Sequence, residues 1–298
     1  MHAFDYQAPT TLREALELLS KPQQSARPLA GGTDLIDQMR VGRLTPEVVI
    51  DIKKIAELNA LRVDSGGLHL GAAVPCYRIC SERAIIDDYS ALVDSCRIIG
   101  GVQIQSRASL GGNLCNSGPA GDSIPSLIAL QATCLIAGPQ GTREVPVESF
   151  CTGPGKNVLR TGELLIELRM PRRAPHSGSH YRRMIPRNEM DIAVVGVGAS
   201  VQLDATGKTI VAARLALGAV APTPLYAESA SQLLAGQPVS DALIAKAAQA
   251  AREIVKPISD MRGTAEYRVH VTGVLVQRAL QAAIVRARGE ACDYRPGH

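Results

Sequence analysis

The chain has 298 residues, 46% hydrophobic and 20% charged, which is enough apolar side chain for two domain cores and excludes wholesale disorder. A net charge of +4 and an aromatic content of 3% argue against a nucleic-acid-binding face. No apolar run reaches the ~20 residues that a membrane-spanning helix needs, and the first residues lack the layout of a secretory signal, so we expect a cytoplasmic protein.

The first half of the chain mixes short helices and strands without a regular strand–helix alternation. Thr11 and Glu14 form a capping box that predicts a helix over residues 12–19. Residues 61–63 and 68–70 flank a Gly-Gly pair and predict a hairpin. Further strands are expected over 27–30, 48–52, 132–137 and 163–170, and further helices over 90–99 and from an N-cap at Ser123.

The composition shifts to Pro, His, Ser and Gly between Arg172 and Ser179, where we expect a boundary between domains 1–175 and 176–298. The arginines on both sides of this stretch are interpreted as the solvated ends of a linker. The second domain is expected to be a small sheet packed with helices. Its strands are predicted over 191–203 and 210–220, and its helices near 226–235, 240–255 and 264–288.

The cysteines and histidines indicate neither a metal site nor an acid–base pair. The seven cysteines are odd in number and lack a C-x-x-C motif; Cys76 and Cys80 form a lone C-x3-C. We therefore expect free, mostly buried thiols in a reducing compartment, with no metal bound by this chain. The histidines stand far apart, and no residue is assigned a catalytic role.

Two glycine pairs carry the strongest functional signal. Gly31-Gly32 is followed by Thr33 and Asp34, and the second pair is followed by polar residues too. Gly-Gly lets backbone N–H groups approach a ligand, so two such loops could hold an extended anion such as a dinucleotide. They could also be ordinary turns, as a third pair at 66–67 is expected to be. The residues of the second loop are Gly111, Gly112, Asn113, Asn116 and Asp122.

Known nucleotide-binding motifs do not account for these pairs. No G-x-G-x-x-G opens a helix after a strand, because Gly196-Val197-Gly198 lacks the third glycine. The run Gly153-Pro154-Gly155-Lys156 lacks the earlier glycine of a P-loop. A Rossmann domain and a P-loop are therefore not expected.

Three longer motifs occur in order along the chain. They are AGGTDL at 30–35, R-x-S-L-G-G-N-L-x-N-x-x-P-x-x-D at 107–122 and P-x-x-D-x-R-G-x-A-E-Y-R at 257–268, with a weaker Asp-Ile-Ala at 191–193. Together they resemble the FAD-binding medium subunit of the molybdenum hydroxylases, the family of carbon monoxide dehydrogenase and bacterial xanthine dehydrogenase. The order and spacing of these motifs agree with those of the family along nearly the whole chain.

The resemblance implies an α+β fold. An FAD-binding domain of the vanillyl-alcohol-oxidase (PCMH) type would be followed by a CO dehydrogenase flavoprotein C-terminal domain, a small antiparallel sheet with helices. It implies FAD in this chain, molybdopterin in a large partner subunit and [2Fe–2S] clusters in a small one, assembled as a dimer of heterotrimers. Electrons would pass from the clusters through FAD to an external acceptor, so the flavin and not a side chain would carry the redox chemistry.

The resemblance also assigns site residues. Ile99 or Gly100 stands where some relatives place an aromatic ring against the flavin. The charged residues of the third motif, Arg262, Glu266 and Arg268, also have a purely structural interpretation as ion pairs within the domain or between subunits. Two alternatives stay open: a stand-alone FAD-dependent oxidoreductase of this fold acting directly on a small molecule, and a scaffold without flavin. The residues implied to bind FAD are Leu29, Ala30, Gly31, Gly32, Thr33, Asp34 and Leu35 around the pyrophosphate, Ser109, Gly112, Asn113 and Asp122 from pyrophosphate to adenine, Leu165 against the flavin and Arg182 as a nearby basic residue.

Overall fold

The computed structural model describes residues 1–21, 24–187 and 190–292. A small parallel sheet forms the N-terminal end of the molecule. Its strand order is β1-β3-β2, with bounds Asp5–Gln7, Val48–Asp51 and Ala26–Leu29. Helix α1 (Leu12–Leu19) precedes β2, and α2 (Leu35–Arg40) follows it. Because parallel strands end at the same edge, the first Gly-Gly loop leaves β2 beside the end of β3.

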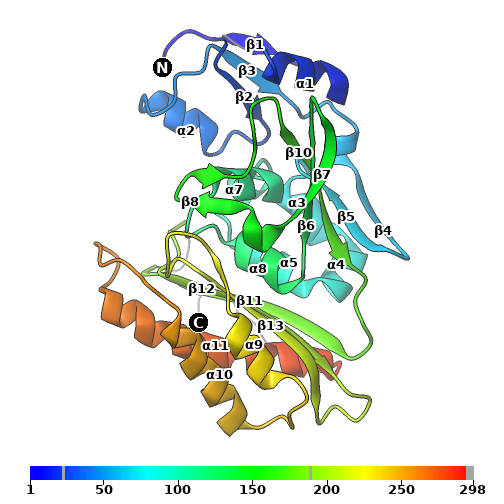
Figure 1. The fold of residues 1–298 in the computed structure, drawn as a ribbon, viewed down its shortest axis with the longest axis vertical. Helices are drawn as coiled ribbons and strands as arrows, with labels where there is room; N and C mark the ends of the chain where they lie inside the picture. Colours follow the sequence, from blue (N-terminus) through cyan, green and yellow to red (C-terminus); the bar gives the residue numbers. More distant parts are fainter. Residues whose placement is uncertain (22–23, 188–189, 293–298) are drawn as a thin grey trace.

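Five antiparallel strands form the second sheet, in the order β4-β5-β10-β6-β7. The buried, apolar β10 joins its two halves, since it pairs with β5 on one side and with β6 on the other. Figure 1 shows helices α5 and α8 between this sheet and the third one. The bounds are β4 Leu61–Asp64, β5 Gly67–Gly71, α3 Cys76–Ser81, α4 Arg83–Asp88, α5 Ser90–Cys96, α6 Val102–Gln105, α7 Leu110–Asn116, α8 Ser123–Ala129, β6 Thr133–Gly138, β7 Gly141–Pro146 and β10 Leu164–Pro171, with a separate pair β8 Cys151–Gly153 and β9 Lys156–Asn157.

The third sheet is antiparallel, in the order β11-β12-β13-β14. The long helix α11 covers one face at β11 and β12, and α5 and α8 pack on the other face (Figure 1). No helix in the described ranges is long and apolar enough to cross a membrane. The bounds are β11 Ser177–Met184, β12 Val195–Leu203, β13 Ile210–Gly218, β14 Leu225–Tyr226, α9 Glu228–Leu234, α10 Asp241–Glu253 and α11 Ala265–Ala287.

Glycines in the third sheet let the backbones of the helices on its two faces pack directly against the strands. A Cβ on Gly178 would lie 2.2 Å from the carbonyl oxygen of Ala283 in α11. On the opposite face, a Cβ on Gly198 would lie 2.4 Å from the carbonyl oxygen of Pro125 in α8. Such distances are far below van der Waals contact, so side chains at these positions would push the helices away from the sheet.

The elements with a strong apolar period were predicted well. The helix over 12–19 is confirmed with these bounds, and Thr11 accepts the backbone N–H of Glu14 as the capping box requires. The hairpin of β4 and β5 is confirmed. The second sheet nevertheless contains more strands than expected, because β7 was not predicted.

Three expectations were wrong. Ser123 is the first residue of α8, and Asp122 holds the N-cap position. The strand expected from residue 191 begins only at Val195. The stretch expected to be a linker leads directly into β11, whose polar residues are buried against partners that lie far away in the sequence.

We predict that Gly198→Ala weakens the packing between α8 and the third sheet. The added Cβ overpacks the contact with Pro125, and we expect the free energy of unfolding to fall by about 2 kcal/mol. Denaturant unfolding measures this change. Gly153→Ala is the matched control, since its Cβ would meet nothing closer than 3.8 Å, and its effect should stay within about 0.5 kcal/mol. Equal losses in both variants would contradict the assignment.

Candidate cofactor site

The two glycine motifs meet in space through their main chains. A Cβ on Gly31 would lie 2.0 Å from the carbonyl oxygen of Arg107, so the first loop lies directly against the start of the second motif. Gly32 has a φ of +79°, a conformation that side-chain-bearing residues rarely adopt. Both glycines of the first pair are therefore required by the backbone itself.

The second glycine pair lies in a helix and not in an open loop as expected. Gly111 and Gly112 are in the first turn of α7, whose N-cap Ser109 accepts the backbone N–H of Gly112 through its Oγ at 3.1 Å. A Cβ on Gly111 would lie 2.4 Å from the carbonyl oxygen of Ala72. A Cβ on Gly112 would meet only the Ser109 Oγ, at 3.1 Å, so this glycine presents bare main chain to open space.

Amide side chains tie the two motifs together. Asn116, at the end of α7, donates through Nδ2 to Oδ1 of Asp34 at 3.1 Å. Its Oδ1 accepts from Nε2 of Gln38 in α2 at 3.0 Å. Partial burial and the like charge of Asp37 raise the pKa of Asp34. Gln38 was not expected from the sequence, because nothing in a single sequence links residues 38 and 116.

Asn113 and Ser123 connect α7 to α8. The Ser123 Oγ donates to the Asn113 Oδ1 at 2.7 Å, and this hydrogen bond does not use the Asn113 amide nitrogen. A Cβ on Gly121 would approach the same oxygen at 3.1 Å. The expected residues of the second motif are thus brought together on α7 and the short segment that follows it.

Asp122 is held by the third sheet. Its Oδ2 lies 2.6 Å from the Nη1 of Arg183, and its Oδ1 accepts from the Tyr181 hydroxyl at 2.8 Å. The Arg183 side chain is 5% exposed and also donates to the carbonyl of Ile98. Burial raises the pKa of Asp122 to about 6, although Arg183 and Tyr181 act in the opposite direction. Arg183 was expected in a solvated cluster, which is wrong because its charge is paired here.

Arg182 lies in β11 and Leu165 lies in β10. Neighbouring strand residues point to opposite faces, so Arg182 faces α11, as Gly178 does, while Arg183 faces α8. Leu165 is buried in β10, beside Ile166, whose carbonyl accepts the backbone N–H of Ala72 at 2.8 Å. Contact of Arg182 and Leu165 with a cofactor stays a prediction.

The third motif forms ion pairs within the chain, which is one of the two arrangements expected; the other was ion pairs between subunits. The buried Arg268 binds Asp260 at 2.7 Å and donates to the carbonyls of Val194 and Ala219. The Nε of Arg262 lies 3.6 Å from Asp191 of the Asp-Ile-Ala motif. The third and fourth motifs therefore meet at the start of β12 and α11.

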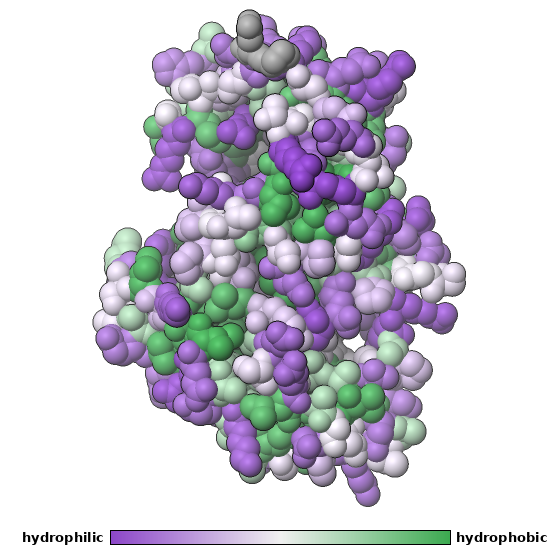
Figure 2. Space-filling view, in the orientation of Figure 1, coloured by the Kyte–Doolittle hydropathy of each residue, from purple (hydrophilic) through white to green (hydrophobic). Residues whose placement is uncertain are grey.

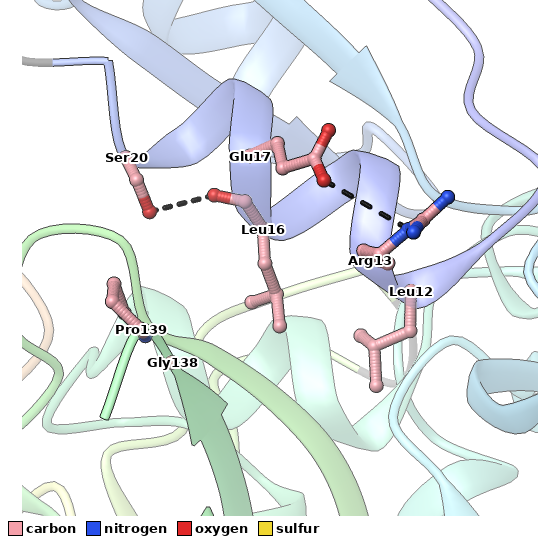
Figure 3. A pocket seen from close by; sticks show the side chains of 7 residues that line it. All are labelled: Leu12, Arg13, Leu16, Glu17, Ser20, Gly138 and Pro139. Atoms are coloured by element: carbon pink, nitrogen blue, oxygen red, sulfur yellow. Dashed lines mark hydrogen bonds and ion pairs between the residues drawn. The ribbon is translucent and has the colours of Figure 1, made fainter. Parts of the chain in front are cut away.

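An apolar hollow elsewhere is unconnected to these motifs. It lies between α1 and the turn that joins β6 to β7, and its volume is about 460 Å³. Leu12, Leu16 and Pro139 line it beside the exposed pair Arg13 and Glu17 (Figure 3). None of the residues expected at the cofactor site lines this hollow.

The site is rich in hydrogen-bonding groups and free of metal-binding clusters. In the described ranges, no three His, Cys, Asp or Glu residues gather as metal ligands would. The bare main chain of Gly112, the Thr33 hydroxyl and the amides of Asn113 and Asn116 suit an anionic, hydroxyl-rich ligand.

Comparison with known protein families gives matches along both parts of the chain. The FAD binding domain in molybdopterin dehydrogenase matches residues 2–173, and the CO dehydrogenase flavoprotein C-terminal domain matches residues 179–283.

Similar proteins and structures agree with these matches. The carbon monoxide dehydrogenase medium chain of Hydrogenophaga pseudoflava is 32% identical over 95% of this chain and 98% of its own. The xanthine dehydrogenase FAD-binding subunit of Escherichia coli O157:H7 is 30% identical over 96% and 97%. A crystal structure of carbon monoxide dehydrogenase from Hydrogenophaga pseudoflava, lacking the Mo-pyranopterin moiety of its molybdenum cofactor, superimposes with a TM-score of 0.91 at 32% identity, covering 96% of this chain and 98% of that one.

We predict that Arg183→Met destabilises the protein in a pH-dependent way. At pH 8 the buried Asp122 carboxylate loses its cation, and we expect a loss of about 3 kcal/mol in the free energy of unfolding. Without Arg183 the folded-state pKa of Asp122 rises further above the unfolded value, so the penalty is present above the folded-state pKa and is relieved as pH falls through it. Denaturant unfolding at pH 8 and pH 5 measures the difference.

The control for this prediction is an exposed pair of the same type. Arg83 lies 2.8 Å from Asp87, but its side chain is 83% exposed. Arg83→Met should change the free energy of unfolding by less than about 1 kcal/mol. A loss in Arg183→Met that equals this control, or that grows toward pH 5, would disprove the buried ion pair.

Proposed function

The chain belongs to the FAD-binding medium subunits of the molybdenum hydroxylases, and on that premise we propose that its two glycine motifs together hold one FAD through which electrons pass to an external acceptor. The observation that carries the proposal is the contact of Gly31 with the carbonyl of Arg107. This contact brings two main-chain segments, each adapted to approach a diphosphate, to one place.

The residues present fit the chemistry of FAD. A diphosphate needs N–H and hydroxyl donors without bulky side chains in between, and Gly112 leaves that space open. We assign residues 29–35 and Ser109 to the pyrophosphate, and Asn113, Asn116 and Asp122 to the ribose and adenine side. Leu165 and Arg182 are assigned to the flavin region.

When bound, FAD supplies the redox chemistry, since it can accept and release electrons one or two at a time. The chain supplies orientation. The hydrogen bonds among Asp34, Asn116 and Gln38 fix α2 against α7, so the donors keep their positions before a ligand arrives. The buried pair of Arg183 and Asp122 fixes the third sheet against the start of α8.

Partner subunits complete the proposed electron path. Relatives carry the names medium chain and FAD-binding subunit, and we propose a large molybdopterin subunit and a small [2Fe–2S] subunit as partners, in a dimer of heterotrimers. Ile258 and Met261, in the loop before α11, are 70% and 92% exposed. Figure 2 shows hydrophobic side chains gathered at the lower left, where this part of the chain lies in Figure 1. Exposed apolar groups of this kind suit a subunit contact.

Two further assignments belong to the proposal. We place the division between the FAD-binding part and the C-terminal part at residues 175 and 176, just before β11. We place the protein in the cytoplasm, a reducing compartment that suits its seven free cysteines. A stand-alone oxidoreductase is not favoured, because the relatives are subunits of larger dehydrogenases.

We predict that the purified chain binds about one FAD per polypeptide, and that Gly112→Val weakens binding at least tenfold, or about 1.4 kcal/mol. The valine side chain would occupy the space left open over the first turn of α7 while meeting only Ser109 Oγ, so the fold should survive. Flavin absorbance after gel filtration and titration of the apoprotein with FAD measure the two quantities.

Gly66→Val is the matched control. Gly66 belongs to a glycine pair in the exposed turn between β4 and β5, and it should retain FAD. Circular dichroism establishes that both variants are folded. A flavin-free wild-type chain that does not take up added FAD would overturn the proposed function, as would equal FAD affinity in wild type and Gly112→Val.

A further inference from the structure

Three of the seven cysteines come together where two helices meet. Cys76 and Cys80 are four residues apart on α3, and therefore lie on the same face of that helix. Cys96 is the last residue of α5, which packs against α3. Burial, and next the neighbouring thiols of Cys76 and Cys80, raise the pKa of Cys96, so the three thiols lie close to one another. No sequence pattern predicted this cluster, since only the spacing of Cys76 and Cys80 was visible.

The three thiols differ in access to solvent. Cys76 and Cys96 have no exposed surface, whereas Cys80 is half-buried. The neighbouring Cys96 thiol and the exposed Arg97 guanidinium favour the thiolate and lower the pKa of Cys80, although its partial burial and the charge of Asp94 oppose the change. Asp94 itself is engaged by Arg286 and His180.

We propose that Cys80 and Cys96 are a redox-active pair, in which Cys80 reacts with hydroperoxides and Cys96 completes a disulfide. The combination of one accessible thiol beside a cation and one fully buried thiol in contact with it is typical of reactive and resolving cysteines. The proposal does not depend on bound flavin, because no residue of the pair belongs to the glycine motifs.

The chemistry balances with hydrogen peroxide as the oxidant. The Cys80 thiolate attacks one peroxide oxygen; a sulfur–oxygen bond forms, the oxygen–oxygen bond breaks, and hydroxide leaves and takes up a proton. The Cys96 sulfur then attacks the Cys80 sulfenic acid, and the hydroxyl leaves as water with the proton of Cys96. Two thiols are oxidised by two electrons, and one peroxide is reduced to two waters. Formation of the disulfide brings the two sulfurs to a bond length of about 2.05 Å.

Cys80 and Cys96 lie next to the segment 97–108, which leads into the second glycine motif. Cys96 immediately precedes residues 97–108, and the backbone N–H of Cys76 donates to the carbonyl of Ala108 at 2.8 Å. A disulfide between α3 and α5 would therefore fix both ends of this segment. The segment also carries the carbonyl of Arg107 that Gly31 contacts.

The test oxidises the full-length, reduced protein with hydrogen peroxide, blocks remaining thiols and digests it with trypsin without reduction. Cleavage after arginine separates the three cysteines into peptides 63–78, 79–83 and 84–97. Mass spectrometry should find 79–83 linked to 84–97, and dithiothreitol should release them. In Cys96→Ser, dimedone should label Cys80 as a sulfenic acid.

Two variants separate a specific pair from general oxidation. Arg97→Gln removes the cation from an exposed position, and alkylation of Cys80 should slow by about three- to tenfold, the change in thiolate fraction for a pKa rise of ~0.5 to 1. Cys134→Ser removes a buried thiol elsewhere, and the cross-link should form unchanged. Peptides 79–83 and 84–97 that stay unlinked, or Cys96 that oxidises equally fast in Cys80→Ser, would overturn the proposal. Flavin content measured on the same samples reports separately on the cofactor site.

Discussion

The contact between the Gly31 α-carbon and the Arg107 carbonyl is the constraint on which the rest of the structure depends. A methyl group at this position would overlap the peptide, so no other residue lets the parallel sheet and α7 approach so closely. Because the contact involves main chain only, it fixes position without using any side chain. The side chains around it are then available for a ligand, and Asp34, Asn116 and Gln38 hold each other in place at its margin.

A close approach of two backbones at a glycine also occurs where the third sheet packs against the helices. Gly198 lets β12 approach α8, and this approach brings β11 near enough for Arg183 to reach Asp122. A residue of the second motif therefore has two roles: it closes the proposed adenine side of the site and anchors the C-terminal part of the chain. Loss of the ion pair would affect both the stability of the fold and the shape of the site.

Sequence patterns predicted those parts in which the local signal and the final structure agree. The capping box and apolar period of α1 gave its bounds, and the glycine motifs identified two segments that lie together in the fold. β11 was not predicted, because residues such as His180 and Arg183 in a sequence pattern indicate solvent-exposed chain. In the folded protein, carboxylates from α5 and the start of α8 pair with these two residues. Gln38 and the thiol cluster were missed for the same reason: their partners lie on other elements, and spacing along one chain carries no information about them.

The charge on Asp122 gives the buried ion pair a further consequence. On the proposed ribose and adenine side of the site, a bare carboxylate would repel the negative charge of the ligand, and burial would strengthen that repulsion. Arg183, at 2.6 Å, offsets the charge while leaving the carboxylate able to accept hydrogen bonds, and the Tyr181 hydroxyl occupies one of its oxygens from the side of the third sheet. The C-terminal part of the chain thus makes an acidic residue compatible with an anionic ligand. The proposed site would therefore depend on the third sheet as well as on the two glycine motifs.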